Sequence, residues 1–144
     1  MDFDKEALEF SKERLNNVPK NIKIEFLNED IIDIVRSKKD EKLNIQHLIY
    51  SIGLADYLPD RVLKHFISTA FSLLYSGGEF IIAHKDKDKF KPLVPDWFTD
   101  WVFYPRNVKD LMKLVGDSVA GNYSFNLDWE NTNKIFFLII TKRR

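Results

Sequence analysis

Hydrophobic and polar residues follow one another along this chain with two different periods, which predict a succession of helices and strands. Spacings of three and four residues between apolar positions are typical of amphipathic helices, whereas two-residue alternation or short apolar runs indicate strands. Helices are predicted in residues 5–16, in a short segment from residue 31, from Pro59 as far as Gly77, and in residues 108–115. Strands are predicted in residues 21–27, 45–51, 80–83, 119–127 and 135–141.

Several predicted helices begin or end at residues that favour a helix terminus. Asp4 is placed to cap the first helix with its carboxylate, and Phe3 and Leu8 have the spacing of a hydrophobic staple around it. Asp30 is placed to cap the second helix. Gly77 can adopt the left-handed conformation that ends the third helix.

The order of these elements indicates the fold class. Helices and strands alternate up to the last two strands, which favours an α/β protein with a mostly parallel sheet. The continuous apolar run at residues 48–50 predicts a strand buried on both faces. The polar turn at residues 130–133 predicts that the last two strands form an antiparallel hairpin.

Composition limits the classes of protein to consider. The chain has 144 residues, about the length of one domain, with 22 basic and 22 acidic side chains, so no excess of positive charge points to nucleic acid. It has no cysteine, which excludes disulfides and thiolate metal sites. The charged N-terminus is unlike a signal peptide, and no apolar run has the length of a membrane span. We therefore expect a cytoplasmic protein.

Three turns are predicted at the carboxyl ends of parallel strands, at residues 2–4, 28–30 and 51–53, and each carries an acidic or small polar residue. In open α/β sheets, ligands bind outside the carboxyl ends of the parallel strands. An acid at a strand end can accept two hydrogen bonds from a ribose diol, and a second acid or amide can receive an adenine amino group. The apolar side chains of Phe3 and Ile31 can enclose the base. This combination suits a ligand that contains a nucleoside.

Five segments carry a resemblance to a known family. The chain resembles the C-terminal two-thirds of a class I S-adenosylmethionine-dependent methyltransferase, which implies a Rossmann-like sheet and S-adenosylmethionine as cofactor. The matching segments are residues 2–8, 26–31, 48–51 and 73–80 and the closing hairpin. The resemblance implies that Asp2 binds the ribose, that Asp30 and Ile31 contact the adenine, and that Ser51 faces the methionine part. Phe3 belongs to the same cofactor-binding set.

Residues 51–58, which we call the acceptor turn, combine turn residues with large apolar ones. Residues 51–61, together with residues 101–106, are similar to bacterial methyltransferases described as makers of a hydroxy-fatty-acid methyl ester signal. The similarity implies a small-molecule or fatty-acid-like methyl acceptor. The substrate-side residues are then Ile52, Gly53, Asp56, Tyr57, Trp101 and Arg106.

Three of these assignments have alternatives that the sequence leaves open. Asp56 can instead cap the helix that follows it. Arg106 can pair either with an acceptor carboxylate or with a nearby acid. The aromatic group within residues 97–104 can form an acceptor lid or part of the core. No catalytic acid–base pair, nucleophile elbow or metal-ligand spacing is visible, so catalytic residues remain unassigned.

The chain also departs from the family. None of its five glycines forms the Gly-rich first motif, and the N-terminal strand, helix and most of the next strand have no counterpart. We therefore expect residues 1–144 to be a single partial domain. One hypothesis is a methyltransferase that is active when the missing part is supplied, in the same chain or by a complementing N-terminal chain. The alternative is a non-catalytic interaction module that binds a partner or a second copy of itself.

Overall fold

A computed structural model describes residues 1–19, 21–33, 43–90 and 102–144 of the chain. The chain divides into two compact units, Met1–Lys39 and Asp40–Arg144, which we call the N-terminal and C-terminal units. Each unit is described by itself. The single domain expected over residues 1–144 remains a prediction.

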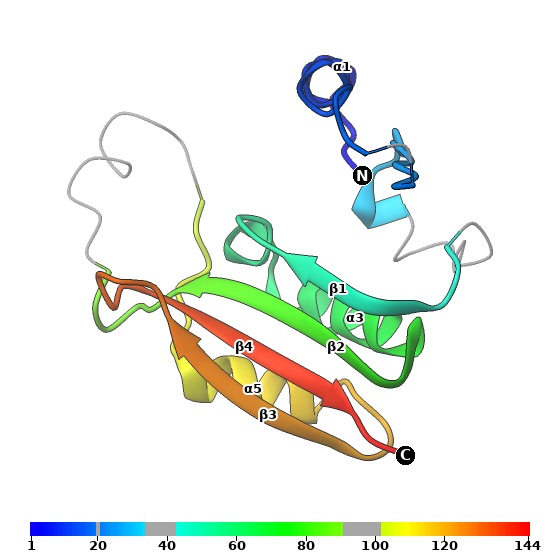
Figure 1. Cartoon of the computed structure of the whole chain (residues 1–144). Helices are drawn as coiled ribbons and strands as arrows, with labels where there is room; N and C mark the ends of the chain where they lie inside the picture. The colour runs from blue at the N-terminus through cyan, green and yellow to red at the C-terminus, as the bar shows by residue number, and fades with distance from the viewer. Residues whose placement is uncertain (20, 34–42, 91–101) are drawn as a thin grey trace. The chain divides into compact units, whose positions relative to one another are not determined.

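The N-terminal unit begins with helix α1, Lys5–Arg14 (Figure 1). The predicted cap is confirmed, because the Asp4 carboxylate accepts hydrogen bonds from the backbone N–H groups of Glu6 at 2.8 Å and Ala7 at 3.4 Å. These bonds satisfy two of the amides that a helix leaves without an internal partner. The helix ends two residues before the predicted boundary at residue 16.

The predicted strand at residues 21–27 does not form, so that prediction is wrong. In its place there is one isolated parallel bridge between Asp2 and Asn28. Ile22 and Ile24, on the alternating apolar side, are exposed. An extended segment becomes a strand only when neighbouring strands form backbone hydrogen bonds along its length. Alternation of apolar and polar residues does not by itself supply such neighbours. The Asp30 cap is confirmed, since its carboxylate accepts from the N–H of Ile32 at 2.8 Å.

The C-terminal unit contains a four-stranded sheet with strand order β1-β2-β4-β3 (Figure 1). Strand β1 pairs parallel with β2, whereas β2 with β4 and β3 with β4 pair antiparallel. The α/β class and the closing antiparallel hairpin are thus confirmed. The strands are β1 Gln46–Ser51, β2 Leu74–Lys85, β3 Tyr123–Trp129 and β4 Ile135–Lys142.

The third predicted helix ends earlier than expected. Helix α3 spans Asp60–Ser72, and β2 already begins at Leu74, so Gly77 does not end the helix. Gly77 has a φ of +87° inside β2, where the pairing with β1 is irregular between Gln46 and Leu48. A β-carbon on Gly78 would lie 3.0 Å from the carbonyl oxygen of His47. The two glycines therefore serve the irregular start of the strand pair.

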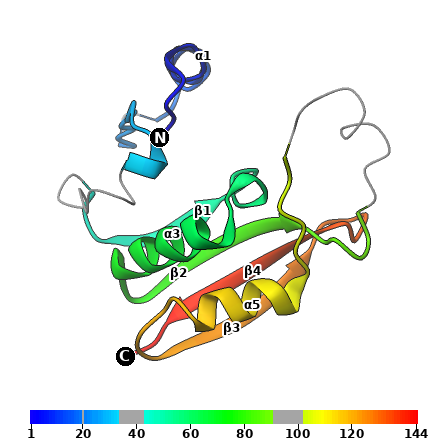
Figure 2. The same ribbon diagram turned by 180° about the vertical axis from the view of Figure 1, so that it is seen from behind.

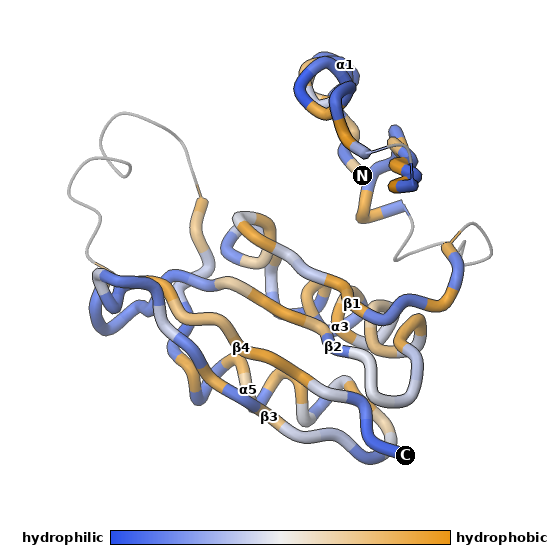
Figure 3. Tube along the Cα trace, in the orientation of Figure 1, coloured by the Kyte–Doolittle hydropathy of each residue, from blue (hydrophilic) through white to orange (hydrophobic). Residues whose placement is uncertain are grey.

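Helices α3 and α5, the latter Val108–Gly116, cover the same face of this sheet (Figure 2). The core lies between them and the alternate strand residues that point toward them, and Figure 3 shows β2 and β4 as hydrophobic along their middle. The fully buried members are Leu63, Ile67, Phe80, Ile82, Leu111, Val115, Phe136, Leu138 and Ile140. This arrangement leaves the tips of β1 and β2 beside the N-terminus of α3.

The prediction that β1 is buried on both faces is wrong. Leu48 is 50% exposed and Tyr50 is 66% exposed. Leu48 pairs with Glu79 and Tyr50 with Ile81 of β2. These pairs lie on the face of the sheet that α3 and α5 do not cover. In the described part of the chain, no helix is long and apolar enough to span a membrane.

Candidate functional site

The N-terminal unit brings two of the predicted cofactor-binding segments together. The backbone N–H of Asp2 donates to the carbonyl of Leu27 at 3.0 Å, and the N–H of Glu29 donates to the carbonyl of Asp2 at 3.1 Å. The Asn28 amide also donates to the carbonyl of Phe3 at 2.9 Å. The two segments therefore run parallel and side by side at Asp2 and Asn28. The sequence analysis placed both segments at the ends of parallel strands, and the bridge brings them together although residues 21–27 form no strand.

The side chains in this region are accessible. Asp2 and Phe3 are exposed, while Asp30 and Ile31 are half-buried. One oxygen of Asp2 accepts from the N–H of Asp4 at 3.0 Å, and one oxygen of Asp30 caps the helical turn that follows it. Each carboxylate has a second oxygen to which no described residue donates a hydrogen bond. A ligand contact is therefore compatible with the turn hydrogen bond of Asp2 and with the capping bond of Asp30.

The predicted cofactor-binding residue of the C-terminal unit, Ser51, ends strand β1. Only 5% of Ser51 is exposed, and its Oγ is the one buried side-chain polar atom in the described part of the chain that has no hydrogen-bond partner. Buried hydroxyl groups are normally hydrogen-bonded. An unpaired hydroxyl at the carboxyl end of a parallel strand is consistent with the predicted position beside a ligand.

The acceptor turn leaves β1 through Gly53, whose φ of +74° favours glycine. It presents Ile52 to solvent and continues into a short helix, η2, Ala55–Tyr57. The two large apolar side chains Ile52 and Tyr57 are exposed, whereas Leu58 is buried. Only part of the apolar turn therefore belongs to the core.

Asp56 does not cap the following helix, so that alternative is excluded. Helix α3 has Pro59 at its N-cap and receives no side-chain cap. The buried Asp56 carboxylate instead accepts from the backbone N–H of Lys85 at 3.1 Å and lies 3.2 Å from His84 Nδ1. Asp56 thus joins the acceptor turn to the end of β2.

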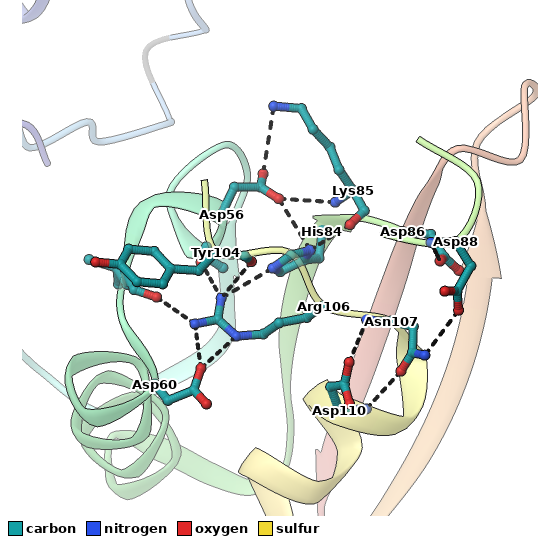
Figure 4. Close-up of polar contacts among 12 residues, drawn as sticks. Asp56, Asp60, His84, Lys85, Asp86, Asp88, Tyr104, Arg106, Asn107 and Asp110 are labelled. Atoms are coloured by element: carbon teal, nitrogen blue, oxygen red, sulfur yellow. Dashed lines mark hydrogen bonds and ion pairs between the residues drawn. The ribbon is translucent and has the colours of Figure 1, made fainter. Parts of the chain in front are cut away.

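Arg106 is 3% exposed and lies beneath the acceptor turn (Figure 4). Its guanidinium donates to five groups of the chain, namely Ala55 O at 3.0 Å, Leu58 O at 2.6 Å, Asp60 Oδ1 at 2.7 Å, Tyr104 O at 3.4 Å and His84 Nε2 at 3.3 Å. The nearby acid is therefore Asp60. A buried guanidinium with these partners has no N–H directed to an acceptor carboxylate, so any role of Arg106 toward the acceptor is indirect.

His84 is a member of this site that the sequence analysis did not assign. It is 1% exposed and stacks on Phe136, with ring centroids 5.8 Å apart. Its Nδ1 lies 2.8 Å from the carbonyl oxygen of Lys85, which can only accept, so Nδ1 carries the hydrogen. Its Nε2 faces Arg106, which can only donate, so Nε2 carries the lone pair.

Burial lowers the pKa of His84 below its ordinary value of 6.5, against the opposing influence of Asp56. The imidazole is therefore neutral at pH 7, in agreement with the tautomer that its neighbours require. The alternation of β2 offered a signal for this residue, because His84 follows Phe80 and Ile82 on the buried face.

Aromatic residues surround Lys85 at the tip of β2. The rings of Tyr57 and Phe103 lie 5.0 Å apart, and the Lys85 ammonium is 4.3 Å from the centre of Phe103. The predicted aromatic group is thus in contact with the acceptor turn at this point. Trp101, like Trp97 and Phe98, lies outside the described residues.

A separate cleft of about 490 Å³ lies between α3 and α5. Among the predicted site residues that the structure describes, Arg106 alone lines it, and charged side chains dominate the rest. These charges pair with one another, as Lys64 does with Asp117 at 2.8 Å. This cleft is therefore not the predicted site. No group of three or more potential metal ligands occurs among the residues that the structure describes.

Comparison with known proteins shows the fold. No family model matches the chain, and no curated protein matches it. A solved structure of an S-adenosylmethionine-dependent methyltransferase from Clostridium acetobutylicum matches 99% of this chain and 73% of its own, with a TM-score of 0.69 and 11% identity. Human N-acetylserotonin methyltransferase, solved in complex with S-adenosylmethionine, matches 99% of this chain and 39% of its own, with a TM-score of 0.65 and 14% identity.

A possible exported protein from Bordetella parapertussis is similar as well, with a TM-score of 0.71 and 16% identity over 99% of this chain and 52% of the other. The chain therefore has the Rossmann-like fold of class I methyltransferases. It spans about half, or less, of the length of several of these proteins.

Proposed function

We propose that the chain is part of an S-adenosylmethionine-dependent methyltransferase that acts on a small or lipid-like acceptor. The observation that carries the proposal is the parallel pairing of Asp2 with Asn28, which sets two acidic segments side by side in the N-terminal unit. The similarity to solved methyltransferases supports it, because those proteins share the fold over almost the whole of this chain.

The chain's residues fit part of the cofactor. Asp2 would hold the ribose, Asp30 and Ile31 the adenine with Phe3 near it, and the unpaired hydroxyl of Ser51 would face the methionine part. The Gly-rich loop of the family has no counterpart in this sequence. A complementing segment, in the same protein or in another chain, would supply it.

When bound, the cofactor supplies a methyl group that is already activated on a sulfonium. The protein then contributes orientation and the exclusion of water rather than an acid or base. In this chain Ile52 and Tyr57 present apolar surface at the acceptor turn, which suits the chain of a fatty-acid-like acceptor. A carboxylate acceptor is a nucleophile without deprotonation, so it requires no general base.

Calorimetry with S-adenosylhomocysteine tests the cofactor site. Asp2→Asn should weaken binding by about 1.5–3 kcal/mol, because it removes the charge from a hydrogen bond to the ribose. The matched control is Glu13→Gln, which changes an exposed acid of α1 in the same way and should leave the affinity unchanged. Equal affinities of the Asp2→Asn variant and the unaltered chain would remove Asp2 from the site. No binding, with or without a complementing N-terminal segment, would remove the proposed function.

A second candidate function is a non-catalytic interaction module. It is favoured by the exposed Leu48 and Tyr50 on β1, which pairs only with β2 among the described strands. Such a strand offers backbone groups and apolar side chains to another chain. Sedimentation velocity and the calorimetry described above together distinguish the candidates. The module predicts a stable dimer that does not bind S-adenosylhomocysteine, whereas the enzyme predicts that the ligand binds.

A further inference from the structure

Three buried residues and one exposed acid connect the acceptor turn to the tip of β2 and to α3. Asp56, His84, Arg106 and Asp60 follow one another in contact, as the dashed lines of Figure 4 show. We propose that His84 is a positioning residue that holds the acceptor turn in place through Asp56 and Arg106 and does so only as a neutral imidazole. The inference deepens the proposed function, on which its relevance to the acceptor rests. We call the four residues the brace.

The first step is the grip of Arg106 on the acceptor turn. Its Nη1 donates to the carbonyl of Ala55 at 3.0 Å and its Nη2 to the carbonyl of Leu58 at 2.6 Å. These two carbonyls stand on either side of Asp56 and Tyr57. Since Arg106 also binds Asp60 through Nε at 2.9 Å, its guanidinium fixes the turn relative to the start of α3.

The second step is the contact between His84 and Arg106. Nε2 lies 3.3 Å from Nη1 and accepts through its lone pair. Protonation of Nε2 would replace that acceptor by a donor and would place two cations in contact in a buried position. Arg106 stays a cation in this contact, because an arginine guanidinium is not deprotonated in proteins. The guanidinium would have to withdraw from the acceptor turn, or His84 would have to leave its position.

The third step is the connection to Asp56. The carboxylate lies 3.2 Å from His84 Nδ1 and accepts from the N–H of Lys85, while the carbonyl of Asp56 accepts from the N–H of Tyr104 at 2.8 Å. His84 therefore contacts the turn at two points, directly at Asp56 and through Arg106 at Leu58.

The charged groups that face the imidazole come from several elements. Asp56 belongs to η2, Lys85 to the same strand as His84, and Arg106 to the segment before α5. Strand β4 contributes only the uncharged ring of Phe136. Asp56 favours the protonated form, whereas burial, Arg106 and Lys85 disfavour it, and burial is the largest of these influences.

The direction of the pH effect follows from this balance. His84 has a lowered pKa in the folded brace, and its ordinary pKa of 6.5 applies once the brace opens. The open form therefore binds a proton more readily, and acidification below pH 6.5 favours opening. The stabilisation is fully present above pH 6.5 and decreases as the pH falls toward the lowered pKa of the folded state.

Amide hydrogen exchange at pH 7.5 and pH 5 tests the proposal on the 144-residue chain. The reporters are the amides of Tyr57, Lys85 and Tyr104, and the reference amides are those of Leu138 and Ile140 in β4. The protection factors of the reporters should fall at pH 5, by at most about thirtyfold, because the open form gains its proton from pH 6.5 downward, and the reference should not change. His84→Gln, which keeps a donor and an acceptor but cannot titrate, should abolish this difference. His65→Gln changes an exposed histidine of α3 and should behave as the unaltered chain.

Reporters that show no pH dependence, or the same dependence in the His84→Gln variant, would overturn the proposal. If that variant does not fold, the nitrogen chemical shifts of His84 in the unaltered chain decide: a hydrogen on Nδ1 supports the brace and a hydrogen on Nε2 overturns it. Neither measurement involves cofactor or acceptor. A chain that shows the pH dependence but no binding of S-adenosylhomocysteine would lose the proposed function and retain the brace as a property of the fold.

Discussion

The two units of this chain differ in how their apolar residues are used. In the C-terminal unit, strands β2 and β4 and helices α3 and α5 contribute fully buried side chains to one continuous core. In the described part of the N-terminal unit, Leu8 is the one hydrophobic residue that is buried, and Phe3, Phe10, Leu15 and Ile22 are exposed. Both units nevertheless contain well-capped helices.

This difference shows that local and long-range interactions contribute separately to the fold. A helix cap forms between residues two or three positions apart. Asp4 and Asn107 therefore both cap their helices, although the two units differ in burial. Burial requires a second layer, which the C-terminal unit has in its sheet. The apolar surface of the N-terminal unit would be covered by a complementing segment under the proposed function.

Replacement of a buried aromatic residue should give the largest effect in this comparison. Phe136→Ala in β4, at 0% exposure, should lower the free energy of unfolding by about 3–5 kcal/mol, because it opens a cavity in the core. Phe10→Ala in α1, at 58% exposure, should change it by less than about 0.5 kcal/mol. Urea denaturation followed by circular dichroism measures both. Equal losses would show that the N-terminal unit has a core of its own.

The polar interior of the C-terminal unit should be the next most sensitive. Arg106→Met fills a similar volume but leaves the carbonyls of Ala55 and Leu58 without their charged donor, at a cost of about 2–4 kcal/mol. The control is Arg61→Met, an exposed arginine of α3, with an expected change of about 0.5 kcal/mol or less. Thermal and urea unfolding of both variants provide the comparison. An Arg106→Met variant as stable as the control would contradict the structural importance of the brace.

Two cap replacements probe the units with the same chemistry. Asn107→Ala removes the capping box of α5, and Asp4→Ala removes the cap of α1; each should destabilise its own helix by about 1 kcal/mol. Because α5 packs on the sheet, Asn107→Ala should shift the cooperative unfolding transition. Asp4→Ala should instead accelerate amide exchange within α1 and leave that transition in place. A shift of the transition by Asp4→Ala would show that the units unfold together.

The smallest expected effect is at the turn between β3 and β4. The Thr132 hydroxyl, together with backbone N–H groups of Thr132 and Lys134, lowers the pKa of Glu130 to about 2. Its contribution to stability is fully present above pH 4.5 and is lost as the pH falls toward about 2. Carboxyl chemical shifts during an acid titration report this pKa. Thr132→Val should raise it, and an unchanged titration would show that the hydroxyl has no influence.

The sequence predicted several residues of the candidate site but not their contacts. The turns at Asp2 and Asn28 were assigned to neighbouring strand ends, and the structure pairs them. The glycine at position 53, the acidic residue at position 56 and the arginine at position 106 were assigned to the acceptor side, and two of them proved to be part of a buried network. Their binding roles remain predictions.

By itself the sequence determined the caps of Asp4 and Asp30, the positions of the main helices and the closing hairpin, because these depend on contacts within a few residues. Only the tertiary structure decided that residues 21–27 form no strand, that β1 has an open face, and that Arg106 holds Ala55 and Leu58. Those outcomes depend on which distant segments of the chain pack together. The periodicity of apolar residues does not specify these long-range contacts.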